Sequence, residues 1–180
     1  MREHKILVTG TVGAGKTTAI GLVSEVAPVV TDVRNSDASI DKARTTVGLD
    51  YGQLTLDNGD IVRLFGTPGQ ARFDFLWKIL ARNALGLIVL MDNSRPDPLA
   101  DMCVYLDGFA EHLRTLPCVV GVGRMQSHAV PTLDDYADRL ASTGRVFPIL
   151  DVDVRRRSDV LVLIDTLLMQ LEADMRGDEE

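Results

Sequence analysis

A glycine-rich stretch near the start of the chain constrains its fold more than any other feature. Residues 10–18 read Gly-Thr-Val-Gly-Ala-Gly-Lys-Thr-Thr, which fits the pattern G-x-x-x-x-G-K-[ST] at every fixed position. The apolar run in Lys5–Thr9 predicts a buried strand, and Thr17–Val26 predicts a helix that stops before Pro28. The pattern therefore lies between a strand and a helix, as a phosphate-binding loop requires.

This loop is expected to bind phosphate oxygens with inward-facing backbone N–H groups and with the positive end of the following helix. The residues of the predicted cradle are Gly10, Val12, Gly13, Ala14, Gly15, Lys16, Thr17 and Thr18. Lys16 is expected to reach the β- and γ-phosphates, and the Thr17 hydroxyl is expected to bind Mg²⁺. The loop alone predicts a nucleotide's phosphates and is shared by kinases, ATPases and GTPases.

Strand and helix patterns alternate along the rest of the chain. Further strands are expected at Thr46–Leu56, Ile61–Phe65, Leu85–Met91, Cys118–Val122 and Val146–Leu150. Helices are expected at Phe73–Leu80, at Asp97–Leu113, at Leu133–Leu140 with Thr132 as N-cap, and from a Ser158 cap to about Met175. The polar stretch 29–44 predicts a long loop.

The order of these elements predicts an α/β fold. Asn58-Gly59 favours a hairpin with a tight primed turn, so one strand would be antiparallel to its neighbour. We therefore expect a doubly wound, mostly parallel, six-stranded sheet of the P-loop NTPase type, with the ligand at the carboxyl ends of the strands.

Composition limits the classes of function. A chain of 180 residues with 46% hydrophobic and 25% charged residues predicts a single globular domain over residues 1–180. The net charge of −7, with one basic cluster at Arg155–Arg157, argues against nucleic acid as a partner. Two isolated cysteines, no membrane-length apolar run and no room for a signal peptide predict a cytoplasmic protein without direct membrane insertion.

Two later segments add to the phosphate-binding loop. Thr45-Thr46-Val47-Gly48-Leu49-Asp50-Tyr51 follows the polar stretch, and Leu64-Phe65-Gly66-Thr67-Pro68-Gly69-Gln70 follows the hairpin. In order and spacing, the three segments resemble the phosphate loop, switch I and switch II of Ras-superfamily small GTPases, over nearly the whole chain. The form L-F-G-T-P-G-Q is similar to the prokaryotic MglA-related and conservon-type GTPases, which often work with roadblock-type proteins.

The resemblance implies a switch that binds GTP or GDP with Mg²⁺. Thr46 would bring its hydroxyl to Mg²⁺ and its N–H to the γ-phosphate, with Thr45 as the alternative register. The Gly69 N–H would bond the γ-phosphate, and Gln70 would orient the attacking water as a catalytic residue beside Lys16. The residues alone also allow Thr46 to be a strand-forming residue and Gln70 to be a polar turn residue.

The base-binding segments depart from the family pattern N-K-x-D. Gly123-Arg124-Met125-Gln126 stands at that position, so the Arg124 stem would cover the base face and Gln126 would accept one hydrogen bond where a carboxylate accepts two. In the following loop, the Val154 N–H would donate to guanine O6. Asp153 is either a replacement carboxylate for the base edge or an ordinary loop aspartate. A preference for guanine weaker than in carboxylate-bearing relatives is therefore expected.

The predicted metal site also departs from the family pattern. Gly66 stands where the family places the switch II aspartate, so weaker Mg²⁺ binding is expected. Arg44 could supply positive charge to the transition state, with Arg34 as a second candidate and a solvated loop arginine as the alternative. The apolar side chains in Phe73–Leu80 belong either to the core or to a surface that an effector reads.

The sequence therefore predicts a slow GTPase whose two switch segments signal to an effector or a GTPase-activating protein, possibly of roadblock type. Mg²⁺ and GTP or GDP are the expected ligands, and no oligomeric state is predicted. One alternative is a nucleotide-binding module, a pseudo-GTPase with weak discrimination between ATP and GTP and little hydrolysis. Another is a small-molecule kinase, although the chain lacks an arginine-rich lid segment.

Overall fold

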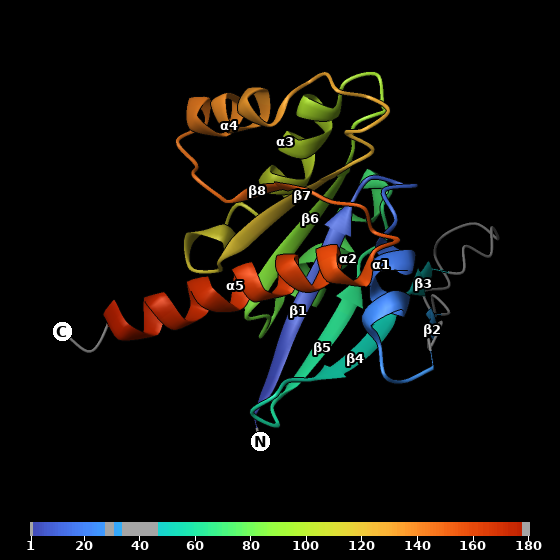
Figure 1. Cartoon of the computed structure of the whole chain (residues 1–180), viewed down its shortest axis with the longest axis vertical. Coiled ribbons are helices and arrows are strands. Elements are labelled where there is room, and N and C mark those ends of the chain that lie inside the picture. Colours follow the sequence, from blue (N-terminus) through green and yellow to red (C-terminus); the bar gives the residue numbers. More distant parts are fainter. Residues whose placement is uncertain (1, 28–30, 34–46, 178–180) are drawn as a thin grey trace.

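A six-stranded sheet forms the centre of the computed structural model, which describes residues 2–27, 31–33 and 47–177 (Figure 1). Its strands are β1 (Glu3–Gly10), β4 (Tyr51–Thr55), β5 (Ile61–Gly66), β6 (Gly86–Asp92), β7 (Cys118–Gly123) and β8 (Ile149–Asp151). Their order across the sheet is β4-β5-β1-β6-β7-β8. Only β4 runs antiparallel to its neighbour, so the predicted mostly parallel sheet with one antiparallel pair is confirmed.

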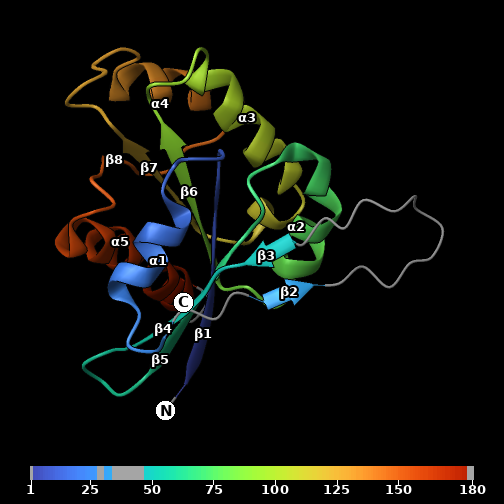
Figure 2. The ribbon, with the colours of Figure 1, turned by 90° about the vertical axis from the view of Figure 1, so that its right-hand side faces the viewer.

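Helices cover both faces of this sheet. They are α1 (Lys16–Val23), α2 (Asp74–Ala81), α3 (Pro98–Gly108), α4 (Leu133–Ser142) and α5 (Arg157–Gly177), with short 3₁₀ helices η1 (Ala71–Phe73) and η2 (His112–Arg114). Figure 2 shows α1 and α5 on one side of the sheet and α2 and α3 on the other. α1 and α5 share one hydrophobic core with the sheet, and α2, α3 and α4 share a second core.

The central strand β6 contributes to both cores. All of its residues are buried, which explains why its sequence is a continuous apolar run. Successive side chains of a strand point to opposite faces, so Ile88 and Leu90 join the α1–α5 core while Leu87, Val89 and Met91 join the other core. The sheet is thereby fixed between two helical layers, and the carboxyl ends of β1, β6 and β7 meet at one edge.

The hairpin between β4 and β5 confirms the antiparallel prediction but not the turn type. The Gly59 N–H donates to Leu56 O, and the Leu56 N–H donates to Asp60 O. A primed turn needs positive φ at one or both central residues, yet neither Asp57 nor Asn58 has it, and only the following Gly59 does, with φ 83°. Asp57 and Asn58 therefore form an ordinary turn that the left-handed Gly59 closes.

The region predicted as switch I differs from the single strand expected at Thr46–Leu56. Its described part forms two strands, β3 (Val47–Leu49) and β4, with Asp50 between them. β3 pairs antiparallel with a short strand, β2 (Thr31–Val33), inside the stretch that was expected to be a loop. β4 instead pairs with β5, so the chain changes partners at Asp50.

Several element ends also differ from the sequence prediction. α1 ends at Val23 and not at Val26, because Ser24 and Glu25 make hydrogen bonds to Gln53 of β4. α3 ends at Gly108, and β8 begins at Ile149, just after Pro148, whose carbonyl accepts a hydrogen bond from the Val120 N–H of β7. Ser158 lies inside α5 and its hydroxyl donates to Asp159, so it is not the N-cap.

The predicted N-cap of α4, Thr132, is confirmed. Thr132 and Asp135 form a reciprocal capping box at its start. Asp97, predicted as the first residue of α3, is its N-cap, and its side chain accepts a hydrogen bond from the Ala100 N–H.

None of the helices in the described ranges is both long enough and apolar enough to cross a membrane.

Candidate functional site

The predicted phosphate-binding loop joins β1 to α1 at the carboxyl edge of the sheet. Gly10, Gly13 and Gly15 have φ values of 136°, 84° and 91°, a region that favours glycine, so the loop can take this shape only with glycine at these positions. Gly15 is the N-cap of α1, and no side chain caps the helix there. The first N–H groups of α1 are therefore left to bind a ligand, with the helix dipole favouring an anion.

Lys16 spans the loop from inside. Its Nζ donates to the carbonyl oxygens of Gly10 and Thr11, at 2.8 Å each, and the side chain is buried. Burial lowers the pKa of Lys16 to about 8, while the nearby Asp50 carboxylate raises it. An ammonium group has three donors, so two hold the loop and one remains for an anionic ligand.

The Thr17 hydroxyl has a hydrogen-bond partner, although the residue is exposed. It donates to Oδ2 of Asp50 at 2.6 Å, which joins the first turn of α1 to the junction of β3 and β4. The hydroxyl keeps its lone pairs for a metal ion while its proton is engaged. Asp50 was not among the predicted site residues, although it is the only acidic residue between Lys42 and Leu56.

The segment predicted as switch II lies directly on the predicted phosphate-binding loop. A Cβ added to Gly69 would come within 2.8 Å of Lys16 Nζ and 2.9 Å of the Val12 N atom, so only glycine permits this approach. The Tyr105 hydroxyl donates to Gly69 O, and burial raises the pKa of Tyr105 to about 12, so the proton stays in place. The structure therefore places Gly69 beside Lys16, and Gln70 is exposed next to it.

The residues that follow Gln70 divide into a buried and an exposed face. Trp77 is buried, stacks against Phe109, and donates through Nε1 to Pro68 O at 2.9 Å. Phe75 and Ile79 are about half exposed, at 52% and 53%. Trp77 thus belongs to the core, whereas the outer face of α2 is available to solvent.

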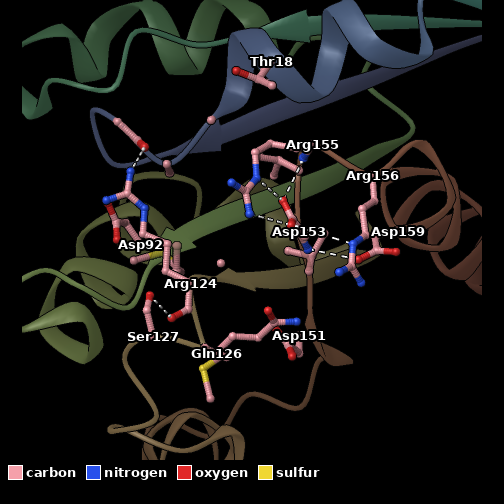
Figure 3. Close-up of a pocket in the computed structure, with 18 residues that line it drawn as sticks. Thr18, Asp92, Arg124, Gln126, Ser127, Asp151, Asp153, Arg155, Arg156 and Asp159 are labelled. Carbon is pink, nitrogen blue, oxygen red and sulfur yellow. Dashed lines mark hydrogen bonds and ion pairs between the residues drawn. The ribbon is translucent and has the colours of Figure 1, made fainter.

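A pocket of about 620 Å³ extends from the phosphate-binding loop across the carboxyl ends of β6, β7 and β8 (Figure 3). From the predicted site it is lined by Gly13, Ala14, Gly15, Thr18, Arg124, Gln126, Asp153 and Val154. Val154 lies against the loop, since a Cβ on Gly15 would come within 2.5 Å of its side chain. The structure thus brings part of the predicted phosphate-binding loop and the predicted base-binding residues to one pocket. The other described residues of the predicted nucleotide site do not line it: Gly10, Val12, Lys16, Thr17 and Gly69.

Arg124 links the two ends of this pocket. Its guanidinium donates to Gly13 O at 3.3 Å and to Ser94 Oγ at 3.2 Å, and lies 3.3 Å from the Asp92 carboxylate. These contacts hold the stem of Arg124 along the pocket, as a residue that covers a base would need. Asp92, for which the sequence predicts no role, is the buried ion partner of Arg124.

Asp153 is engaged within its own loop. Its carboxylate accepts hydrogen bonds from the Arg155 side chain, at 2.8 Å to both Nε and Nη2, and from the Arg155 N–H at 3.0 Å. The Arg155 guanidinium thereby holds the pKa of Asp153 well below its usual range. Figure 3 shows the carboxylate facing Arg155, which leaves it with little capacity to accept hydrogen bonds from a base.

Thr45, Thr46, Arg34 and Arg44 lie outside the described residues. Within the described part of the chain, no three His, Cys, Asp or Glu side chains are grouped so that they could hold a metal ion. The predicted Mg²⁺ site needs no such group, because Mg²⁺ in nucleotide sites is bound by one or two protein oxygens, by phosphates and by waters. Thr17 and Asp50 supply oxygen atoms of this kind.

Comparison with known proteins gives little functional information. No family model matches the chain. The chain is 31% identical over 94 residues to the uncharacterized protein MJ1339 of the archaeon Methanocaldococcus jannaschii. The matched stretch covers 52% of this chain and 53% of that protein, about half the length of each.

Proposed function

We propose that this chain is a P-loop NTPase of the Ras-like small GTPase kind, which binds GTP or GDP with Mg²⁺ and hydrolyses GTP slowly. One observation carries the proposal. Lys16, bonded to Gly10 O and Thr11 O, lies directly beside Gly69 of the switch II segment. A γ-phosphate bound at Lys16 would therefore meet the Gly69 backbone, and its presence could be transmitted to α2 through Gln70 and Trp77.

In this proposal the chain's residues have separate roles. Lys16 would neutralise the β- and γ-phosphates, and Thr17 would bind Mg²⁺ together with phosphate oxygens and waters. Gln70 would orient the attacking water, for which its exposed position next to Gly69 is suitable. Hydrolysis would be slow unless an arginine reaches the transition state, and Arg44 is the candidate by sequence alone. Arg72, which follows Gln70 closely, lies over the Phe73 ring.

The output would be a change in the Gly69–Trp77 region that a partner protein reads. Phe75 and Ile79 on the exposed face of α2 would then form part of the contact with an effector or a GTPase-activating protein, for which a roadblock-type protein is the candidate from sequence resemblance. A cytoplasmic location is part of the same proposal.

Single-turnover hydrolysis tests the catalytic part. Replacing Gln70→Leu should slow γ-phosphate release at least about tenfold, because the water would no longer be oriented, while GDP affinity stays within about twofold. The matched control is Gln53→Leu, which makes the same substitution at a glutamine of β4, away from Gly69. It should leave the rate unchanged. Equal rates for the wild type and Gln70→Leu would remove Gln70 from the mechanism.

One observation favours a second candidate, a nucleotide-binding module with weak base specificity and little hydrolysis. The Asp153 carboxylate is occupied by Arg155, and Gln126 cannot replace a carboxylate at the base edge. This candidate predicts that wild-type protein and Gln70→Leu hydrolyse GTP equally slowly, and that GDP and ADP bind equally well. The same two measurements therefore separate it from the GTPase proposal.

A further inference from the structure

The space beside Gly66 is filled by a carboxylate from another strand. A Cβ added to Gly66 would come within 2.9 Å of Asp50 Cβ and 3.1 Å of Asp50 Oδ2. Because real Cβ atoms essentially never approach closer than 3.0 Å, a side chain at position 66 and the Asp50 side chain compete for the same volume. The absence of an aspartate at the end of β5 therefore coincides with the presence of an aspartate at the same place in space.

Asp50 is held there by the backbone. The Gly66 N–H donates to Asp50 O at 2.8 Å, directly beyond the antiparallel pair Tyr51–Phe65 that joins β4 to β5. The change of strand partner between β3 and β4 occurs at this residue, so its side chain is turned toward α1 and not into either ladder. Its position is thus fixed by the same sheet that positions Gly66.

The Asp50 carboxylate also contacts the predicted metal ligand. Oδ2 accepts the proton of the Thr17 hydroxyl at 2.6 Å, a short hydrogen bond of the kind that ionised acceptors make. The carboxylate raises the pKa of Lys16 and so favours its charged form. The Asp50 carboxylate, the Thr17 hydroxyl and the Lys16 ammonium therefore lie together at the start of α1. A metal ion bound there would balance the negative charge of the carboxylate and of the phosphates.

We propose that Asp50 is the carboxylate of the Mg²⁺ site, supplied from the β3–β4 junction in place of a residue at the end of β5. It would act on the ion through the Thr17 hydroxyl, by fixing the direction of that proton, and through a metal-bound water. The inference rests on the proposed nucleotide-dependent function and replaces the expectation that Gly66 weakens Mg²⁺ binding.

The obvious alternative is that Asp50 only fastens α1 to the sheet. A fastening role and a metal role predict different effects of Mg²⁺. Loss of a fastening hydrogen bond would lower thermal stability and change nucleotide release equally with and without Mg²⁺. Loss of a metal carboxylate would change nucleotide release only where Mg²⁺ acts, since partners of metal ligands typically contribute about 10- to 100-fold to metal affinity.

The experiment measures release of a fluorescent N-methylanthraniloyl-GDP from the full chain over a Mg²⁺ titration. For Asp50→Asn, which keeps the shape and an acceptor oxygen, the Mg²⁺ concentration that half-maximally slows release should rise at least about tenfold. Release in the presence of a chelator should stay within about twofold of the wild type. Asp57→Asn, an exposed aspartate at the hairpin tip, is the matched control and should leave both values unchanged.

A swapped variant gives the stronger test. In Asp50→Gly combined with Gly66→Asp, removal of the Asp50 side chain clears the two closest contacts of the new Cβ. The remaining contact, at 3.1 Å, is to Ile20 Cδ1 at the end of a flexible side chain. The swap should restore the half-maximal Mg²⁺ concentration to within about threefold of the wild type, whereas Gly66→Asp alone should reduce thermal stability.

The outcomes separate the two proposals. Saturable GDP binding by the wild type, with the same Mg²⁺ response in Asp50→Asn, would overturn the role of Asp50 and leave the proposed function standing. A folded swapped variant that binds GDP without a Mg²⁺ response would also overturn it, even if Asp50→Asn proves unstable. No saturable GDP binding by the wild type would overturn the proposed function, and the role of Asp50 with it.

Discussion

The loop between β1 and α1 and the loop after β8 border the same pocket, but they use their charged groups differently. In the first loop, the buried Lys16 holds two backbone carbonyls and keeps one donor for a ligand. In the second loop, Arg155 and Asp153 satisfy each other, and Arg155 is exposed. The predicted phosphate end is therefore organised for an anion, whereas at the predicted base end Asp153 and Arg155 are already paired.

This difference bears on affinity and specificity. A preorganised cradle loses little free energy in ordering when a phosphate binds, so most of the affinity should come from the phosphate end. Discrimination between bases needs polar groups that only the correct base satisfies, and a carboxylate already held by a guanidinium contributes little. We therefore expect nucleotide affinity to depend strongly on Lys16 and only weakly on Asp153.

The largest effect should come from Lys16→Met, which keeps the length of the side chain and removes its charge. The variant loses a buried, charge-assisted bond to phosphate, so GDP affinity should fall about 100-fold, or about 2.8 kcal/mol, in calorimetric titrations with Mg²⁺. Lys78→Met, an exposed lysine on α2, is the matched control and should change affinity less than twofold. A similar loss in both variants would show that general charge, and not this cradle, attracts the nucleotide.

An intermediate effect is expected from pH. Burial lowers the pKa of Lys16 from 10.5 to about 8, so the free protein loses this positive charge as pH rises through that value. Phosphate binding favours the charged form, and GDP affinity should therefore fall by close to tenfold between about pH 7 and about pH 9. The fall should be absent from Lys16→Met when both proteins are titrated across this range. An identical pH profile in the variant would assign the effect to another group, such as the base itself.

The smallest effect should come from Asp153→Asn. Because Arg155 already occupies the carboxylate, the ratio of GDP to ADP affinity should change less than about threefold. Asp151→Asn, an exposed residue of the same pocket, serves as the matched variant for loss of a negative charge. A tenfold or greater loss of GDP preference in Asp153→Asn alone would mean that Arg155 releases the carboxylate to the base, and the contrast between the two ends would fail.

The sequence was sufficient for those parts of the site that are contiguous in the chain. The shape of the predicted phosphate-binding loop could be anticipated because its glycines and Lys16 lie within one turn and one helix start. The sheet could be predicted because the continuous apolar runs, such as β6, differ from the alternating pattern of β5. The N-cap of α4, Thr132, could be predicted from local sequence in the same way.

The rest depended on contacts between distant segments. Asp50 reaches Thr17 only because the chain changes strand partners at that residue, which no local pattern indicates. The early end of α1 results from hydrogen bonds to Gln53, and the position of Gly69 depends on Tyr105 of α3. Arg155, the partner of Asp153, is only two residues away in the sequence. The sequence still could not decide whether the Asp153 carboxylate faces Arg155 or the base.

The most direct test of the proposed function is calorimetric titration of the nucleotide-free chain with GDP and with ADP, with and without Mg²⁺. We expect one saturable site per chain, with GDP binding at about micromolar Kd or tighter, weakened by Mg²⁺ removal. GDP should bind more tightly than ADP, by less than about 100-fold, because the base end lacks a free carboxylate. Absence of saturable binding of either nucleotide at roughly millimolar concentration would contradict the account.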